Sequence, residues 1–108
     1  MTKVFEELVN LDRLVHEPAR LSIMTALSVV QSADFTFLQR ITGLSMGNLS
    51  NHLAKLEEGG MIKIIKGYAN NRPNTTINIT PLGKQTIDNH WQQLQKFHEE
   101  SKGLKKDR

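Results

Sequence analysis

The sequence predicts an α+β fold that is mostly helical, with a helical pair, a two-stranded β hairpin and a long terminal helix. Three observations predict it. Two short helical segments are joined by a Gly-Leu-Ser turn, two apolar runs then flank a polar loop, and a long apolar stripe follows a Thr-Pro pair near the C-terminus. This order of elements is that of a winged helix-turn-helix.

The helical pair is predicted at residues 35–42 and 46–58. Gly43 ends the first helix, because glycine accepts the positive φ that helix C-caps often need. Ser45 is expected to cap the second helix, since its hydroxyl can satisfy a free backbone N–H there. Helices joined by so short a turn cross steeply.

The second helix has two unlike faces. Helical spacing puts Leu49, Leu53 and Leu56 on one side, with His52 at its edge. The other side carries short or amide-bearing residues where an ordinary surface helix more often carries Glu and Lys. A helix in the DNA major groove needs such side chains, because its backbone must approach the base edges. The predicted DNA-binding residues of this helix are Ser45, Gly47, Asn48, Ser50, Asn51 and Lys55.

A basic hairpin is predicted to follow, with apolar runs at residues 61–65 and 75–79 around a loop that contains Asn70, Asn71 and Pro73. No Asp or Glu occurs from residue 59 to residue 87. A stretch whose charged side chains are all positive attracts phosphate. Lys63, Lys66 and Arg72 are the predicted DNA contacts of the hairpin, and Arg72 at the loop tip is the best placed to reach a minor groove.

Residues 14–95 resemble small winged-helix transcriptional regulators related to the MarR and ArsR families. The segment GNLSNHLAKLE, an Arg-Pro pair in the predicted hairpin and the later Thr-Pro-Leu-Gly carry the resemblance. The resemblance implies a homodimer that binds double-stranded DNA at an operator, usually as a repressor. It identifies neither the operator nor any small-molecule effector.

Composition fits a single domain at residues 1–102 with a flexible basic tail at residues 103–108. The chain has 108 residues, a net charge of +3 and no cysteine. Absence of cysteine removes disulfides and thiolate metal sites and fits a reducing cytoplasm. No targeting or membrane segment is evident, because the apolar stretches fall short of the roughly 18 residues of a membrane span. We expect a cytoplasmic protein.

Both ends of the chain are predicted to be helical and to form a dimer. A terminal apolar stripe has little core to cover in so short a chain, so a second subunit is the expected partner. The alternative for Trp91 is packing against the first helix of its own chain. The predicted interface residues are Leu8, Leu11, Ile87, Trp91, Leu94 and His98.

Other functions fit the sequence less well. His90 and His98 are eight residues apart, whereas zinc ligands on one helix face lie three or four apart, so no metal or cofactor is expected unless a site assembles across a dimer. No nucleophile-elbow, phosphate-loop or paired-carboxylate motif supports an enzyme. The alternative that stays open is a winged helix that binds another protein instead of DNA.

Overall fold

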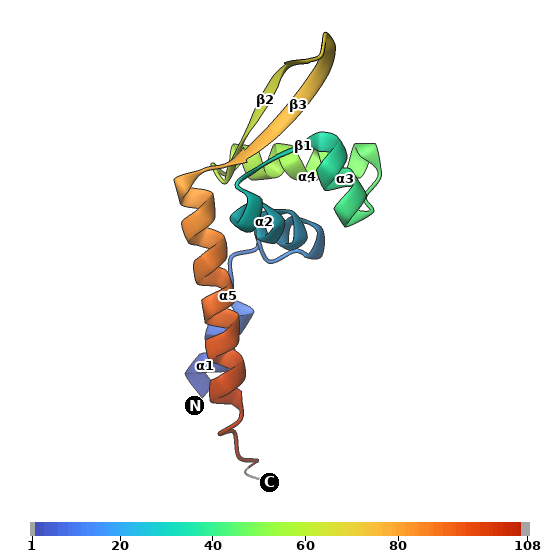
Figure 1. Ribbon diagram of the computed structural model, residues 1–108. Coiled ribbons are helices and arrows are strands. Elements are labelled where there is room, and N and C mark those ends of the chain that lie inside the picture. The colour runs from blue at the N-terminus through green and yellow to red at the C-terminus, as the bar shows by residue number, and fades with distance from the viewer. Residues whose placement is uncertain (1, 107–108) are drawn as a thin grey trace.

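The computed structural model describes residues 2–106 and shows a mostly helical chain with one small antiparallel sheet (Figure 1). Within this range the elements, in order, are α1 (Thr2–Val9), α2 (Pro18–Val30), β1 (Ser32–Asp34), α3 (Phe35–Thr42), α4 (Met46–Glu58), β2 (Ile62–Ala69), β3 (Arg72–Ile79) and α5 (Pro81–Ser101). The predicted winged helix-turn-helix fold is confirmed. Residues 107–108 of the predicted flexible tail lie outside the described residues.

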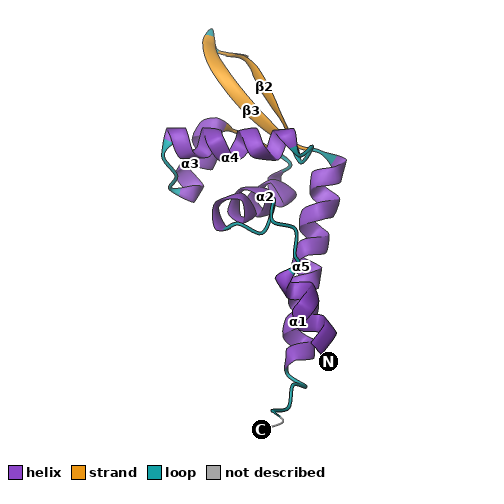
Figure 2. Cartoon of the chain, turned by 180° about the vertical axis from the view of Figure 1, so that it is seen from behind, coloured by secondary structure: helices purple, strands orange, loops and turns teal. Residues whose placement is uncertain are grey.

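Side-chain caps set the bounds of the helices, which is why local sequence predicted them well. The Asp34 carboxylate accepts the Phe37 N–H at 2.7 Å, and the Ser45 hydroxyl accepts the Asn48 N–H at 3.2 Å. Gly43 ends α3 in the left-handed conformation, with φ at 71°. These caps fix the turn between α3 and α4 and therefore their crossing (Figure 2).

The sheet differs from the prediction in two ways. It has a third strand, because β1 pairs with residues 76–78 of β3 and gives the order β1-β3-β2. The loop between β2 and β3 is also shorter than expected. Only Asn70 and Asn71 form the turn, both with positive φ (54° and 62°), while Arg72 and Pro73 already pair within β3. Asparagine tolerates this conformation, so a tight hairpin turn forms without glycine.

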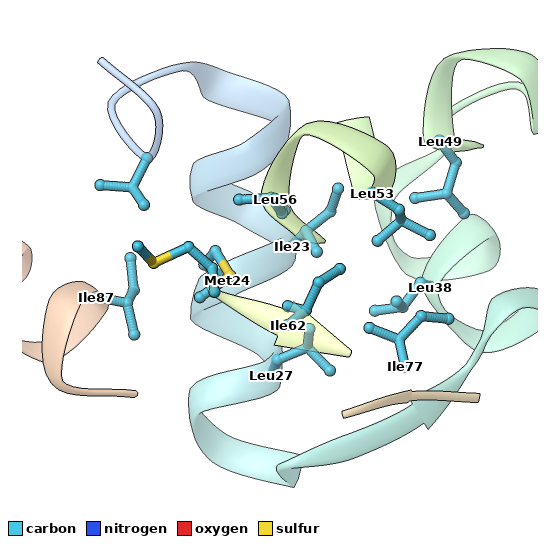
Figure 3. Close-up of a cluster of buried hydrophobic side chains, with 12 residues drawn as sticks. Ile23, Met24, Leu27, Leu38, Leu49, Leu53, Leu56, Ile62, Ile77 and Ile87 are labelled. Carbon is cyan, nitrogen blue, oxygen red and sulfur yellow. The ribbon is translucent and has the colours of Figure 1, made fainter. Parts of the chain in front are cut away.

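The core lies where α2, α3 and α4 meet the base of the sheet (Figure 3). Its fully buried members include Ile23, Met24, Leu27, Leu38, Leu49, Leu53, Leu56, Ile62, Ile77 and Ile87. Complete burial of a Leu or Ile side chain is worth about 1.5–3 kcal/mol. The core therefore fixes α4 and the root of the hairpin against one scaffold.

The molecule is elongated, with the hairpin at one end and a stalk formed by α1 and α5 at the other (Figure 1). Its dimensions are 66 × 26 × 21 Å and its radius of gyration is 16.8 Å. A compact domain of this length has a radius of gyration of about 13 Å. Within the stalk, a separate small cluster of Val4, Leu11 and Phe97 joins α1 to α5.

A histidine pair connects α5 to the segment before α2. His90 is 2% exposed, and its Nε2 lies 3.0 Å from Nδ1 of His16. Burial, and next the neighbouring His16, lower the pKa of His90 below its ordinary value of 6.5. The sequence spacing of the histidines did not reveal this contact, because the two residues are 74 positions apart.

Gly83 is required where α5 begins. A Cβ there would lie 2.1 Å from the carbonyl oxygen of Met61, and Thr80 fixes the same point by donating to the Met61 carbonyl at 3.0 Å. We expect Gly83→Ala to lower the free energy of unfolding by about 2 kcal/mol or more, because the new methyl group would displace the backbone at Met61. Chemical denaturation measures the change.

Gly47→Ala is the matched control, since nothing lies within 4 Å of a Cβ at that helical position and alanine favours helix. It should be at least as stable as the wild type. Equal stability of Gly83→Ala and the wild type would show that α5 is not fixed against the residue 61 peptide.

Candidate nucleic-acid interface

The two faces of α4 are separated as the sequence predicted. Leu49 and Leu56 are fully buried and Leu53 is 2% exposed. The polar residues on the other side are all exposed: Ser45, Gly47, Asn48, Ser50, Asn51 and Lys55. Because the apolar face is locked in the core, the uncharged polar face has one orientation, toward solvent.

The wing, which comprises β2, the Asn70–Asn71 turn and β3, is held to α4 by a specific contact. Strand β2 is an edge of the sheet, and its Ile64 N–H donates to Glu57 Oε2 at the end of α4, at 2.8 Å. This bond satisfies an edge N–H that has no strand partner. It also fixes the root of the wing relative to the polar face of α4.

Strand alternation divides the basic residues of the wing between two faces. Lys66 shares its face with Ile64 and lines a groove with Ser50 of α4. Lys63 and Arg72 lie on the other face, because Lys63 adjoins Ile64 and Arg72 pairs with Ala69. All three are exposed. The structure therefore brings Lys66 together with Ser50 of α4 and places Arg72 next to the wing tip. Lys63 lies at the wing root on the opposite face, in a hollow that it shares with Glu57 at the end of α4.

Two exposed residues beside this groove were not among the sequence candidates. Tyr68 is 81% exposed on the same strand face as Lys66, and Met46 is 66% exposed at the first turn of α4. A phenol can donate to phosphate and a thioether can contact a base methyl. The alternation of side chains along β2 puts Tyr68 on the same face as Lys66. The sequence analysis missed it because it predicted a loop at this position.

The wing is positively charged, as the sequence predicted, whereas the basic residue that follows it is paired with an acidic one. Lys84 pairs with Asp88 of the same helix at 2.7 Å, so the basic residue that follows the wing is compensated. The carboxylate-free stretch leaves the wing positive over the length of both strands. A surface of this kind attracts phosphate without a large net charge on the whole chain.

The predicted interface residues of the stalk divide into exposed and buried ones. Leu8 is 37% exposed, Trp91 is 45% exposed and His98 is exposed, while Leu94 is half-buried. Ile87 is instead fully buried in the core, and Leu11 (7% exposed) lies in the cluster between α1 and α5. These two side chains pack within their own chain and are unavailable to a partner.

Trp91 packs in a way that neither prediction described. Its indole Nε1 donates to the Thr25 hydroxyl on α2 at 2.8 Å, so the intramolecular contact is with α2 and not with the first helix. One side of the ring faces α2, and 45% of the residue remains exposed to solvent. A half-exposed tryptophan held in one orientation is suited to a protein contact.

Residues 2–106 hold no group of three or more His, Cys, Asp or Glu side chains arranged to bind a metal ion. No helix in this range is both long enough and apolar enough to cross a membrane.

Comparison with known proteins assigns the family. The family model described as a winged helix DNA-binding domain matches residues 19–98. Uncharacterized protein MJ0432 of Methanocaldococcus jannaschii is 31% identical over 78 residues, which are 72% of this chain and 85% of that protein. The solved transcriptional regulator homologue of Pyrococcus horikoshii OT3 has a TM-score of 0.82 and 29% identity, covering 94% of this chain and 99% of that chain.

More distant structures share the fold. A MarR-family regulator from Silicibacter pomeroyi has a TM-score of 0.64 and 18% identity, covering 96% of this chain and 68% of that chain. An ArsR-family regulator is also among the structural neighbours. The resemblance predicted from the sequence is confirmed, and the chain belongs to the winged helix DNA-binding domain family, with the fold of MarR and ArsR transcriptional regulators.

Proposed function

We propose that this protein is a sequence-specific, double-stranded DNA-binding transcriptional regulator that acts as a homodimer in the cytoplasm. One observation carries the proposal: α4 exposes a continuous uncharged polar face while its leucines are fully buried, and a positive wing is attached beside it. The repressor role rests on the resemblance to MarR and ArsR regulators, in which occupation of an operator blocks transcription.

The polar face of α4 is the proposed base-reading surface. Asn48 and Asn51 are exposed, and an amide can pair with an adenine edge through one donor and one acceptor. Gly47 has open space around it, so the helix backbone can approach the groove closely. Ser45, Ser50 and Lys55 flank these residues and are the proposed contacts to phosphate or base.

The wing is the proposed backbone contact. Lys66 lines the groove beside α4, and Tyr68 lies further along the same strand face, where both would meet the phosphates that border the major groove. Arg72, next to the turn, extends furthest along the wing and is the proposed minor-groove or phosphate contact. Among the predicted DNA contacts of the wing, Lys63 is the least well placed, because it lies at the wing root on the opposite face from Lys66.

The stalk is the proposed dimer interface. A helix of eight residues such as α1 is not stable alone, and the small cluster between α1 and α5 covers only one side of the pair. Apolar side chains remain exposed along the stalk, and a second stalk would cover them. The proposed interface is Phe5, Leu8, Trp91, Leu94 and His98.

Binding to random duplex DNA tests the function directly. We expect micromolar or tighter binding at low salt, with the logarithm of the affinity falling linearly with the logarithm of salt concentration, by about 0.9 for each phosphate neutralised. Fluorescence anisotropy with a labelled duplex measures both. Absence of binding at low salt would instead favour the protein-binding module.

Asn51 and Lys55 should differ in what they contribute, because one is assigned to bases and the other to phosphate. Asn51→Ala should weaken binding to the preferred sequence by about 1–3 kcal/mol and reduce the preference for that sequence. Lys55→Ala should weaken binding to all sequences alike and reduce the dependence of the affinity on salt. Competition binding with matched and scrambled duplexes separates the two. Unchanged preference in Asn51→Ala would contradict the base-reading role.

Leu8→Glu should break the dimer, since it places a charge within the proposed apolar interface while costing the monomer little at a site already 37% exposed. We expect the sedimentation mass to fall at micromolar concentration and DNA affinity to fall with it. Val29→Glu, at a position 79% exposed on α2, is the matched control and should leave the mass unchanged. A Leu8→Glu protein that stays dimeric would show that the stalk is not the interface.

A further inference from the structure

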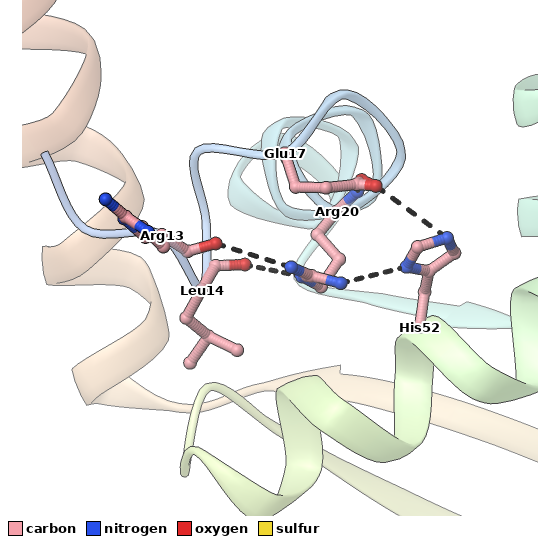
Figure 4. A network of polar contacts seen from close by, with 5 residues as sticks. All are labelled: Arg13, Leu14, Glu17, Arg20 and His52. Atoms are coloured by element: carbon pink, nitrogen blue, oxygen red, sulfur yellow. Dashed lines mark hydrogen bonds and ion pairs between the residues drawn. The ribbon is translucent and has the colours of Figure 1, made fainter. Parts of the chain in front are cut away.

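Arg20, in the first turn of α2, connects three parts of the chain through one guanidinium group (Figure 4). Its Nε donates to the Leu14 carbonyl at 2.6 Å, and one terminal nitrogen donates to the Arg13 carbonyl at 3.3 Å. The other terminal nitrogen lies 3.2 Å from Nδ1 of His52 on α4. A guanidinium can only donate, so Nδ1 of His52 is the accepting nitrogen.

His52 is thereby held from both sides. With Nδ1 accepting from Arg20, the ring proton sits on Nε2, which points toward Glu17 Oε2 at 3.8 Å. Burial alone would raise the pKa of Glu17, but the backbone N–H groups of Arg20 and Ala19, together with the charge of Arg20, hold it below its ordinary 4.5. The Glu17 carboxylate also caps α2 by accepting the Arg20 N–H at 3.0 Å.

The carbonyls that Arg20 binds belong to residues 10–17, here called the strap, which lead from α1 to α2. The strap is anchored in the stalk by Leu11, which packs with Phe97, and by His16, which contacts His90 of α5. Arg20 therefore bonds, on one side, a segment fixed to the stalk and, on the other, the helix that carries the polar face.

Leucine packing alone leaves α4 some freedom to rotate or slide, because apolar contacts are not directional. A planar guanidinium with three fixed bonds removes that freedom, since its donors match only one arrangement of acceptors. The network reaches α4 at His52, which lies at the edge of the buried face, one helical turn from Asn48. The Arg20 donors are directed to the strap carbonyls and to His52, so we expect the network to act on DNA through the position of the helix.

We propose that Arg20 is a positioning residue for DNA reading: by bonding the strap and His52 together, it fixes the angle of α4 to the stalk and so the separation of the two α4 helices in a dimer. This inference rests on the proposed function. A two-fold operator is read only when both helices reach successive major grooves, so a change in their separation lowers affinity without loss of any DNA contact.

The chain has no cysteine, so a single Glu58→Cys substitution at the exposed end of α4 accepts one spin label per protomer. The dipolar distance between the labels of a dimer then reports the separation of the two helices. We expect one narrow distribution in the wild-type background and a broad one with Arg20→Gln. Affinity for an inverted repeat selected by the wild type from random duplexes should fall about tenfold, while affinity for random duplex and its salt dependence stay unchanged.

Matched variants separate positioning from charge and from folding. Arg13→Gln removes the same charge from an exposed side chain and should behave as the wild type. His52→Gln retains an oxygen that can accept from Arg20 and should keep most of the affinity, whereas His52→Leu should lose it. The Arg20→Gln, His52→Leu double variant should be no worse than Arg20→Gln alone, because Arg20→Gln already removes the bond that His52→Leu removes.

The result that overturns the inference is a narrow distance distribution and unchanged repeat affinity in both Arg20→Gln and His52→Leu. His52→Leu keeps the strap bonds of Arg20, so it carries the test if Arg20→Gln fails to fold. A fall in melting temperature that accounts for the whole loss of affinity would also overturn it, by reducing Arg20 to a stabilising residue. A wild type without a dipolar signal, or without affinity for random duplex, would refute the proposed function itself and this inference with it.

Discussion

Burial of one face of α4 is the constraint on which the rest of the structure depends. Leu49, Leu53 and Leu56 are enclosed by α2, α3 and the base of the sheet, and each is almost completely removed from water. A helix packed in this way presents its opposite face outward, and the contact of Arg20 with His52 limits the freedom that packing leaves. The poor helix formers on that face, Gly47 and Asn48 among them, are tolerated because packing and the Ser45 cap stabilise the helix instead.

The proposed function gives separate roles to the two ends of the elongated molecule. The wing extends beyond α4 from a root fixed by the Glu57 contact, and the stalk extends in the other direction with apolar side chains left exposed (Figure 1). A single domain of this size reads little DNA, so selective binding needs two recognition helices at a fixed separation. The strap and Arg20 lie between the two ends, where a rigid connection is needed.

Local chemistry explains what the sequence could predict. The bounds of α3, α4 and α5 depend on Asp34, Gly43, Ser45 and Thr80, each of which acts within a few residues of itself. Strand β1 was missed because its three residues carry no periodicity and exist as a strand only through pairing with β3. The wing turn was drawn too long because Asn70, Asn71 and Pro73 favour loops in general, and only the observed register shows that two of them suffice.

The placement of the candidate site residues could be predicted only where a local pattern sets it. The exposed face of α4 follows from helical spacing, whereas Ile87 and Trp91 lie on the same apolar stripe and only the fold shows that the first is core. Spacing likewise cannot assign Lys66 and Arg72 to opposite faces of the wing without the strand bounds. His52 meets Arg20 from 32 positions away, so no local pattern marks this contact.

The central claim is that a pair of α4 helices, each with its wing, reads DNA as a two-fold unit. Genome-wide footprinting of the wild-type protein tests this claim most directly. We expect discrete protected sites that share an inverted repeat, with half-site centres about 10 base pairs, or a multiple of that, apart. Protection of single, unrepeated half-sites, or no sequence-specific protection at all, would contradict it.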